Sequence, residues 1–203
     1  MKKTSLTAIV TAIAICVSAG VSMAGVDLKS GNLAPLKSEK KLKVQYDYSN
    51  MKVGKDETEE QYVNKKVAEA NQKDPGKGDA WKSGWIGARE SRYEPKFQEL
   101  FNKESESRQI AKGNTDAKYT LIVKTTHTEP GFNVGVMKRP SSVDFTFLVV
   151  ETADNSKVIA ELSLENIPGS QMMGGDFDAG SRIAESYAKA GKMLGKYFES
   201  KIK

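Results

Sequence analysis

Apolar and polar residues alternate along three stretches in the second half of the chain, at 119–126, 143–150 and 158–164. The apolar positions are rich in β-branched and aromatic side chains, a pattern typical of strands that bury one face. We therefore predict an antiparallel meander of three strands within residues 117–165, and we expect the rest of the chain to fold on this sheet. A similar alternation at 42–49 predicts a fourth strand, which comes earlier in the chain.

Two helices are predicted between the first strand and the meander. Asp56 and Glu59 are compatible with a capping box, and the helix that they open should extend to about Asn71. A second pair with the same spacing, Ser91 and Glu94, predicts the start of another helix. Between the two helices, a stretch of Pro, Gly, Lys and Asp at 73–79 predicts a surface loop.

A third helix, the longest, is predicted at the C-terminal end, with Asp176 or Asp178 as its cap. Its apolar stripe contains Gly191 and Gly195, which should let the helix backbone approach the sheet closely. The order of elements predicts an α/β protein of the α+β kind. We expect a mixed, mostly antiparallel, four-stranded sheet that is backed by helices, with the long C-terminal helix packed on it.

The first 24 residues have the features of an export signal. Lys2 and Lys3 form a basic start, and an apolar run follows at 6–17. Ser22 and Ala24 then fit the positions before a cleavage site. The run is shorter than the roughly 20 apolar residues that a membrane-spanning helix needs. We therefore predict an exported protein without a transmembrane helix once the signal is removed. It is expected in the periplasm or at the periplasmic face of the outer membrane, and an extracellular location is left open.

The mature chain is expected to have two parts. Residues 25–41 contain few apolar side chains and predict a flexible leader. Residues 42–203 suit a single α/β domain with one core. Removing the signal removes two of the 31 basic residues, so 29 basic residues face 26 acidic ones. This small net charge does not indicate a nucleic-acid partner.

Few residues in the chain could support catalysis or hold a metal. The single cysteine, Cys16, lies inside the signal, and no small residue precedes it as a lipid-attachment site requires. His127 is the single histidine and the mature chain has no cysteine, so Cys-His and multi-histidine zinc sites are excluded, and the usual Ser-His-Asp constellation is absent. We expect His127 to be a partly exposed polar residue at a strand end, and we predict no metal and no cofactor.

Glu161 and Glu165 are the remaining candidates for acid–base chemistry. They fall on the strand face opposite the apolar positions of the third meander strand. A glycosidase needs two carboxyl groups in a cleft, whereas this pattern predicts a solvated sheet face. The sequence therefore predicts no catalytic residue.

The second half of the chain resembles a known kind of domain. A strand opens at Ala117-Lys118-Tyr119, residues 147–159 form a hairpin with the turn sequence Glu-Thr-Ala-Asp-Asn-Ser, and an amphipathic helix ends the chain. This arrangement, over residues 97–202, resembles the TolB amino-terminal domain and the periplasmic domain of the curli-secretion pore protein. The resemblance implies a non-enzymatic role in envelope assembly or secretion. Pore-forming relatives carry long amphipathic hairpins, whereas the corresponding connection here is short, which argues against pore formation.

Topology predicts one candidate binding surface. In an antiparallel meander, loops 128–142 and 166–175 emerge at the same end of the sheet. Adaptable Met and aromatic side chains on mobile loops suit protein binding. The alternative is that the apolar residues of loop 128–142 simply extend the strands. The predicted binding residues are Phe132, Val136, Met137, Lys138, Arg139, Met172 and Met173.

A second candidate surface combines Trp81, Trp85, Arg89 and Arg92. Aromatic rings stack on apolar ligand faces, and arginine makes paired hydrogen bonds, so this set suits a sugar or an anionic group. Gly84 and Gly87 argue against a firm helix in this segment, and the two tryptophans could instead fill a satellite core.

Together these observations predict a non-catalytic exported module that binds another envelope or secretion component. Binding would use the paired loops or would add a strand at a sheet edge. The alternative is a periplasmic protein that binds a small ligand or glycan through the Trp81 and Trp85 region. The partner protein is not identified by the sequence, and homo-oligomerisation is left open.

Overall fold

The computed structural model describes residues 25–134, 137–169 and 179–202. Two of its short helices are irregular: η1 is a 3-10 helix and η2 is a π-helix. Along the chain, the elements are β1 (Asp27–Gly31), η1 (Ala34–Leu36), β2 (Lys41–Asp47), β3 (Lys52–Val53), β4 (Glu57–Thr58), α1 (Glu59–Lys73), α2 (Lys77–Ala88), η2 (Arg89–Tyr93), α3 (Glu94–Glu104), β5 (Gln109–Ala111), β6 (Tyr119–Glu129), β7 (Phe132–Val134), β8 (Met137–Arg139), β9 (Ser142–Glu151), β10 (Asp154–Pro168) and α4 (Ala179–Lys201).

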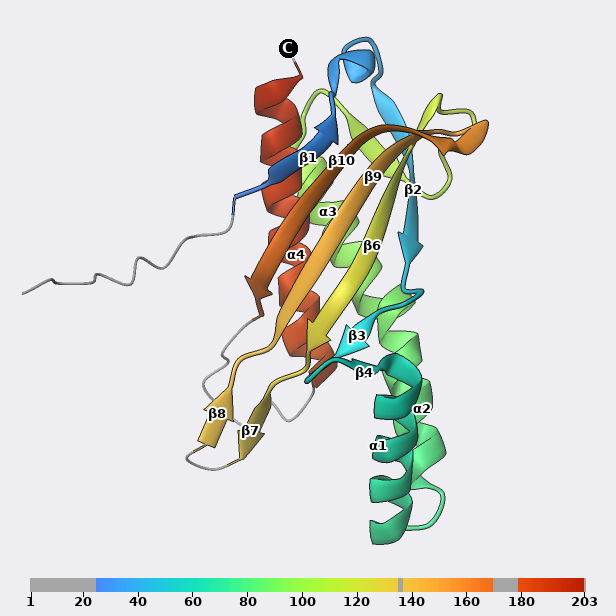
Figure 1. Ribbon diagram of the computed structural model, residues 1–203, viewed down its shortest axis with the longest axis vertical. Coiled ribbons are helices and arrows are strands. Elements are labelled where there is room, and N and C mark those ends of the chain that lie inside the picture. Colours follow the sequence, from blue (N-terminus) through green and yellow to red (C-terminus); the bar gives the residue numbers. More distant parts are fainter. Residues whose placement is uncertain (1–24, 135–136, 170–178, 203) are drawn as a thin grey trace, which may run out of the picture.

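Within these residues, eight strands form one mixed sheet. Its main order is β1-β10-β9-β6-β2-β5, and β3 and β4 are attached beside β6. α3 and α4 cover one face of the sheet (Figure 1). The predicted α+β class is confirmed, but the expected number of four strands was too low. The four additional strands have five residues or fewer, too few to show a clear alternating pattern.

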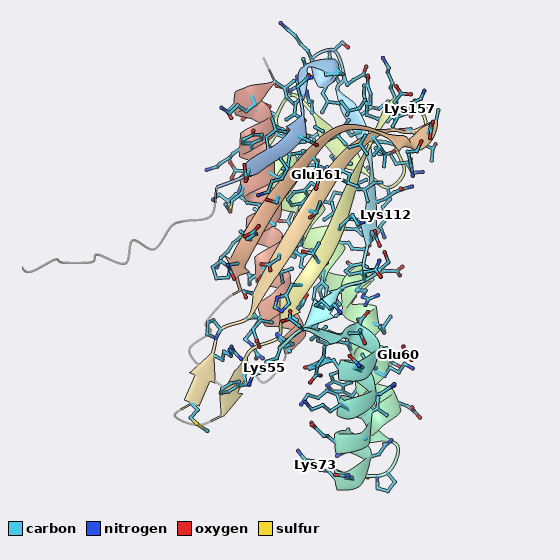
Figure 2. All side chains as sticks on the ribbon, in the orientation of Figure 1. Lys55, Glu60, Lys73, Lys112, Lys157 and Glu161 are labelled. Atoms are coloured by element: carbon cyan, nitrogen blue, oxygen red, sulfur yellow. The ribbon has the colours of Figure 1, made fainter. Side chains whose placement is uncertain are left out.

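The central strands β6, β9 and β10 form the predicted antiparallel meander. Val123, Phe147 and Leu162 stand opposite one another on the three strands, and all three side chains are buried. The ring of Phe147 stacks on Phe97 of α3, with 5.9 Å between ring centroids. Glu161 lies on the open face of the sheet, as expected (Figure 2).

The segment before β2 differs from the flexible leader expected at 25–41. β1 pairs antiparallel with β10 and forms one edge of the sheet. The following residues Leu33 and Leu36 are buried in the core. Arg108 fixes this turn, because its Nε donates a hydrogen bond to the carbonyl oxygen of Leu36 at 3.0 Å. Backbone pairing and two buried leucines order a segment whose composition is mostly polar.

α1 and α2 form a helical hairpin, here called the arm, which projects beyond the sheet (Figure 1). The capping box of α1 consists of Thr58 and Gln61, not of the predicted Asp56 and Glu59. The Thr58 hydroxyl accepts from the Gln61 backbone N–H at 3.2 Å, and the Gln61 side chain accepts from the Thr58 N–H at 2.9 Å. Asp56 has a positive φ of 61° and belongs to the preceding turn.

The turn between the arm helices is tighter than the predicted loop at 73–79. Asn71 Oδ1 accepts hydrogen bonds from the backbone N–H groups of Gly76 and Gly78, at 3.1 and 2.8 Å. A Cβ atom on Gly78 would lie 2.7 Å from the carbonyl oxygen of Val67, so the glycine permits the close approach of the two helices. As a result, α2 begins inside the stretch predicted to be a loop.

α2, η2 and α3 follow one another without a break. The expected interruption near Gly84 and Gly87, and the predicted new helix start at Ser91, are both wrong. The Ser91 hydroxyl donates to the carbonyl oxygen of Gly87, one turn earlier, at 2.7 Å. Pro95, in the first turn of α3, has no N–H to donate, and its ring crowds the preceding turn, which accounts for the wider π-helix at η2.

The glycines of α4 bring this helix close to α3, and not to the sheet as expected. A Cβ atom on Gly195 would lie 2.6 Å from the carbonyl oxygen of Phe101. A Cβ atom on Gly191 would collide with the carbonyl oxygen of Phe97. Between the two helices, the rings of Phe101 and Phe198 meet edge to face. No helix in the described part of the chain is both long and apolar enough to cross a membrane.

Candidate functional site

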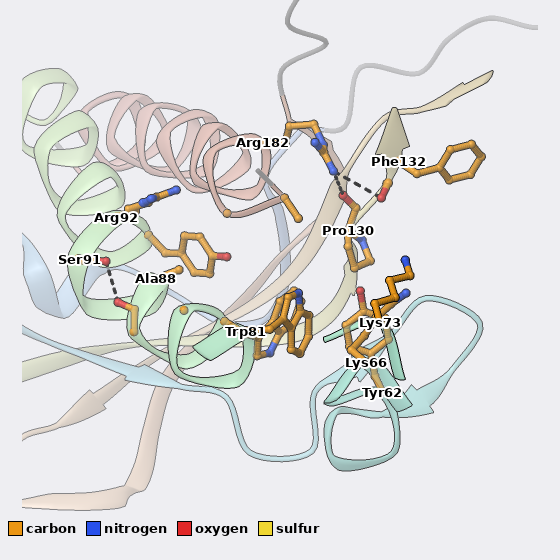
Figure 3. Close-up of a pocket in the computed structure, with 17 residues that line it drawn as sticks. Tyr62, Lys66, Lys73, Trp81, Ala88, Ser91, Arg92, Pro130, Phe132 and Arg182 are labelled. Carbon is orange, nitrogen blue, oxygen red and sulfur yellow. Dashed lines mark hydrogen bonds between the residues drawn. The ribbon is translucent and has the colours of Figure 1, made fainter. Parts of the chain in front are cut away.

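A pocket of about 1000 Å³ lies where the arm meets the β6–β7 turn and the start of α4 (Figure 3). We call it the arm pocket. This volume is at the upper end of the range for ligand sites, about 300 to 1000 Å³. The lining residues are Tyr62, Lys66 and Lys73 from α1; Trp81, Gly84, Trp85, Gly87, Ala88, Ser91, Arg92 and Tyr93 from α2 and η2; Pro130, Gly131 and Phe132 from the turn and β7; and Ala179, Gly180 and Arg182 from α4.

Three aromatic side chains form one wall of the pocket. Trp81 and Trp85 lie four residues apart in α2, so they share one helix face. Their rings are stacked, with 5.6 Å between centroids and 14° between planes. Tyr62 of α1 packs against both, at 6.0 and 5.2 Å. The wall therefore depends on both helices of the arm, and each of these side chains is only half-buried.

A chain of polar contacts behind the wall holds Trp85 in place. Its indole Nε1 donates to Glu59 Oε1 at 2.7 Å, and the same oxygen pairs with Arg89. The guanidinium of Arg89 lies 4.2 Å from the ring centroid of Tyr48. Arg89 was predicted to face a ligand beside the tryptophans. It instead faces the interior and is not part of the pocket lining.

The β6–β7 turn and α4 form the other side of the pocket. Arg182, buried at the start of α4, donates from Nη2 to the carbonyl oxygen of Pro130 at 3.2 Å. Arg92 also lines the pocket, and its Nη1 donates to Ser181 Oγ at 3.1 Å. These bonds connect η2, α4 and the turn that carries Phe132.

Gly84 and Gly87 line the pocket where α2 would otherwise present side chains. A Cβ atom on either residue meets no other atom within 4 Å. Packing therefore does not require glycine here, in contrast to Gly78 in the turn of the arm. Each interior glycine lowers helix stability by about 1 kcal/mol relative to alanine. We interpret the two glycines as positions that keep the pocket open.

The polar groups of the arm at this site are lysines and a tyrosine hydroxyl. Lys66 pairs with Glu69 at 2.8 Å, and the exposed Lys73 lies toward the far end of the arm (Figure 2). Burial raises the pKa of Tyr62 to about 12, and the carboxylate of Glu129 adds to this effect. The Tyr62 hydroxyl, which is protonated at neutral pH even at the usual pKa near 10, thus remains a hydrogen-bond donor further into the alkaline range.

The predicted loop surface is described only in part. Phe132 is 44% exposed and lines the arm pocket, so it joins the surface predicted around the tryptophans. Met137 is 62% exposed on the β7–β8 hairpin, and Arg139 pairs with Glu129 at 3.2 Å. For the loop residues the sequence left two alternatives, an extension of the strands or a binding surface. In the structure, β7 and β8 pair with each other as a two-stranded sheet that is separate from the main one.

Several predicted binding residues cannot be placed in this surface. Val136, Met172 and Met173 lie outside the described residues, and so does loop 166–175 beyond Gly169. Lys138 belongs to β8, but the position of its side chain is not described.

The other chemical candidates lie away from the arm pocket. His127 is half-buried, with Nε2 2.8 Å from the carbonyl oxygen of Gly54 and Nδ1 3.8 Å from Asp144. Glu161 and Glu165 do not line the pocket. Among the described residues, no group of three His, Cys, Asp or Glu side chains could hold a metal ion.

No protein-family model matches the sequence, and a search of curated proteins finds no significant match. The structure is similar to the PelC dodecamer from Paraburkholderia phytofirmans, with 16% identity, coverage of 85% of this chain and 98% of that chain, and a TM-score of 0.39. A single-residue variant of that dodecamer gives 18% identity, the same coverage and a TM-score of 0.38. A Xanthomonas campestris protein of the DUF330 family gives 10% identity, 80% and 84% coverage, and a TM-score of 0.37. Likenesses of this degree say nothing about ligand, partner or assembly.

Proposed function

We propose that this chain is a non-catalytic binding protein of the exported, envelope-associated kind, and that the arm pocket is its binding site. One observation carries the proposal. Aromatic side chains from three separate segments, Tyr62 of α1, the tryptophans of α2 and Phe132 of β7, line the same open pocket. Ligand sites are typically concave, with several apolar or aromatic groups and a few placed polar ones. Phe132 of the predicted loop surface thus lies in the same pocket as the two predicted tryptophans.

The pocket lining suits recognition. Stacked rings offer a flat apolar surface, and the lysines and hydroxyl groups around them offer hydrogen-bond donors. The ion pair between Glu59 and Arg89 fixes the wall from behind, so the site is formed before a ligand arrives. Such preorganisation reduces the entropy that binding costs.

Intrinsic fluorescence gives a direct test, because the two tryptophans of the chain are Trp81 and Trp85. Purified protein would be titrated with three separate fractions of an envelope extract: soluble glycans, phospholipid vesicles and detergent-free proteins. We expect one fraction to change the tryptophan emission. Gly87→Leu, which fills the pocket, should abolish the change, and Gly113→Leu is the matched control, because a Cβ atom there also meets nothing within 4 Å. Equal responses from both variants would contradict the proposal.

A second candidate function is docking of a partner protein on the β7–β8 hairpin. The exposed side chains of Phe132 and Met137 favour it, because large apolar groups at a protruding edge often serve as contacts with partners. A photo-crosslinking residue at Met137 would be compared with one at Val158, which is 48% exposed on β10. We expect one envelope protein to be captured from Met137 alone, whereas equal capture at both positions would exclude this surface.

A further inference from the structure

The arm pocket combines two kinds of surface that a saccharide requires together. A sugar ring has an apolar face of C–H groups and a rim of hydroxyl groups. The half-buried pair Trp81 and Trp85 offers flat aromatic surface for the first, and Lys66, Lys73 and Ser91 around the pocket offer polar groups for the second. We propose that the arm pocket binds an oligosaccharide. This inference rests on the proposed function and names its ligand class.

The lining of the arm pocket carries four cationic side chains, Lys66, Lys73, Arg92 and Arg182, and no carboxylate among the described residues. The Lys66 ammonium is already paired with Glu69, and Arg89 is paired with Glu59 behind the wall. Arg182 donates to the backbone carbonyl oxygens of Pro130 and Gly131. Arg182 thus contributes to the structure of the site, whereas Lys66, through its further N–H groups, and the exposed Lys73 can donate hydrogen bonds to hydroxyl or acidic groups of a saccharide.

The size of the pocket favours an oligosaccharide over a single sugar. Its volume of about 1000 Å³ extends along the arm from Arg92 in η2 to Lys73 in the last turn of α1. Figure 3 shows Arg92 and Lys73 at opposite sides of the pocket, with Trp81 between them. An elongated ligand can use the whole length, whereas a monosaccharide would leave most of it filled with water.

The bare helix surface at Gly84 and Gly87 indicates where a ring can lie. Both glycines line the same pocket as the tryptophans, and added Cβ atoms there would project into open space. A sugar ring beside Trp81 could therefore rest on the backbone of α2. Because a Cβ atom at Gly84 meets no other atom within 4 Å, a larger side chain there starts in open space, and urea unfolding can separate its effect on binding from its effect on folding.

The test is a titration of tryptophan emission with defined probes: cellohexaose, chitohexaose and maltohexaose, phosphatidylglycerol vesicles, and a tryptic digest of casein. We expect at least one hexasaccharide to bind saturably to the wild type and to Gly113→Leu. Gly84→Leu should weaken that binding by at least about tenfold, as occlusion of a fitted pocket does, and its urea unfolding would show that it is folded. In Trp81→Ala, binding is followed by the emission of Trp85, and the affinity for the hexasaccharide should fall by a similar factor.

Each other outcome is decisive. A response to vesicles or to the casein digest, with none to the hexasaccharides, would overturn the saccharide inference and leave the arm pocket as the binding site. Saccharide binding that Gly84→Leu leaves unchanged would overturn the placement of the ligand on α2. No response to any probe would overturn the saccharide inference, and no response to the envelope fractions either would overturn the proposed function itself.

Discussion

The indole Nε1 of Trp85 donates a hydrogen bond to Glu59 Oε1, 2.7 Å away, and so links the two helices of the arm behind the pocket wall. Glu59 also pairs with Arg89, which lies against the ring of Tyr48 beside the sheet. One carboxylate thus determines the orientation of the aromatic wall and connects the arm to the domain.

Replacing Glu59 should therefore disturb both the pocket and the fold. In Glu59→Ala, the indole N–H and the Arg89 guanidinium lose their acceptor while they remain largely buried. We expect the free energy of unfolding to fall by about 1–3 kcal/mol, and the emission of Trp85 to change in the absence of ligand. Glu59→Gln keeps an acceptor for the indole and should retain most of the wild-type emission. Urea unfolding and emission spectra measure the two effects, and identical spectra for all three proteins would contradict the assigned role.

Replacing a glycine by alanine should change the free energy of unfolding in opposite directions in α4 and in α2. Gly191→Ala places a Cβ atom against the carbonyl oxygen of Phe97 and should lower the free energy of unfolding by about 1–3 kcal/mol. Gly84→Ala projects into the open pocket and should raise it by up to about 1 kcal/mol, through helix propensity alone. Denaturant unfolding of the two variants is the measurement, and a destabilised Gly84→Ala would show that the glycine has a packing role.

The N-terminal segment should behave as part of the core. Leu36 is fully buried, so Leu36→Ala should cost about 2–5 kcal/mol of unfolding free energy. Leu28→Ala, at the 38% exposed position of β1, serves as the control and should cost much less. If both variants unfolded at the wild-type denaturant concentration, residues 25–41 would be the flexible leader that composition predicts.

Alkaline pH should destabilise the fold through its buried tyrosines. Burial raises the pKa of Tyr48 and Tyr187 above the usual value near 10. Above that pH the unfolded chain loses protons that the folded chain retains. The contribution of these tyrosines to stability is thus constant below about pH 10 and falls as the pH rises, by about 1.4 kcal/mol per pH unit for each retained proton. Urea unfolding between pH 9 and pH 12 would test this, and Tyr187→Phe should show a smaller slope than the wild type.

Alternation and helical spacing predicted the elements with long, regular patterns. β6, β9, β10 and α4 are where the sequence placed them. The missed strands are short, and they are held by backbone pairing that side-chain patterns do not reveal, as in β1. α2 was missed because Gly84 and Gly87 have low helix propensity, which the packing of Trp81 and Trp85 against Tyr62 overrides.

The site was predicted in pieces. Trp81 and Trp85 were predicted as part of one candidate surface, and the loop that contains Phe132 as another. That both line one pocket depends on the arm folding back beside the β6–β7 turn, a long-range arrangement that periodicity does not encode. Tyr62 could have been identified as an aromatic residue on the apolar face of α1. Arg89 was assigned to the ligand surface because the sequence does not reveal its ion pair with Glu59, which joins two helices.

The central claim is that the arm pocket is the binding site, and the two indole N–H resonances of the protein test it most directly. In a ¹⁵N NMR titration with the envelope fraction that changes the tryptophan emission, we predict that the Trp81 and Trp85 indole signals shift saturably. The same titration of Gly84→Leu should leave both signals in place. Binding that moves other resonances while both indole signals stay fixed in the wild type would contradict the claim.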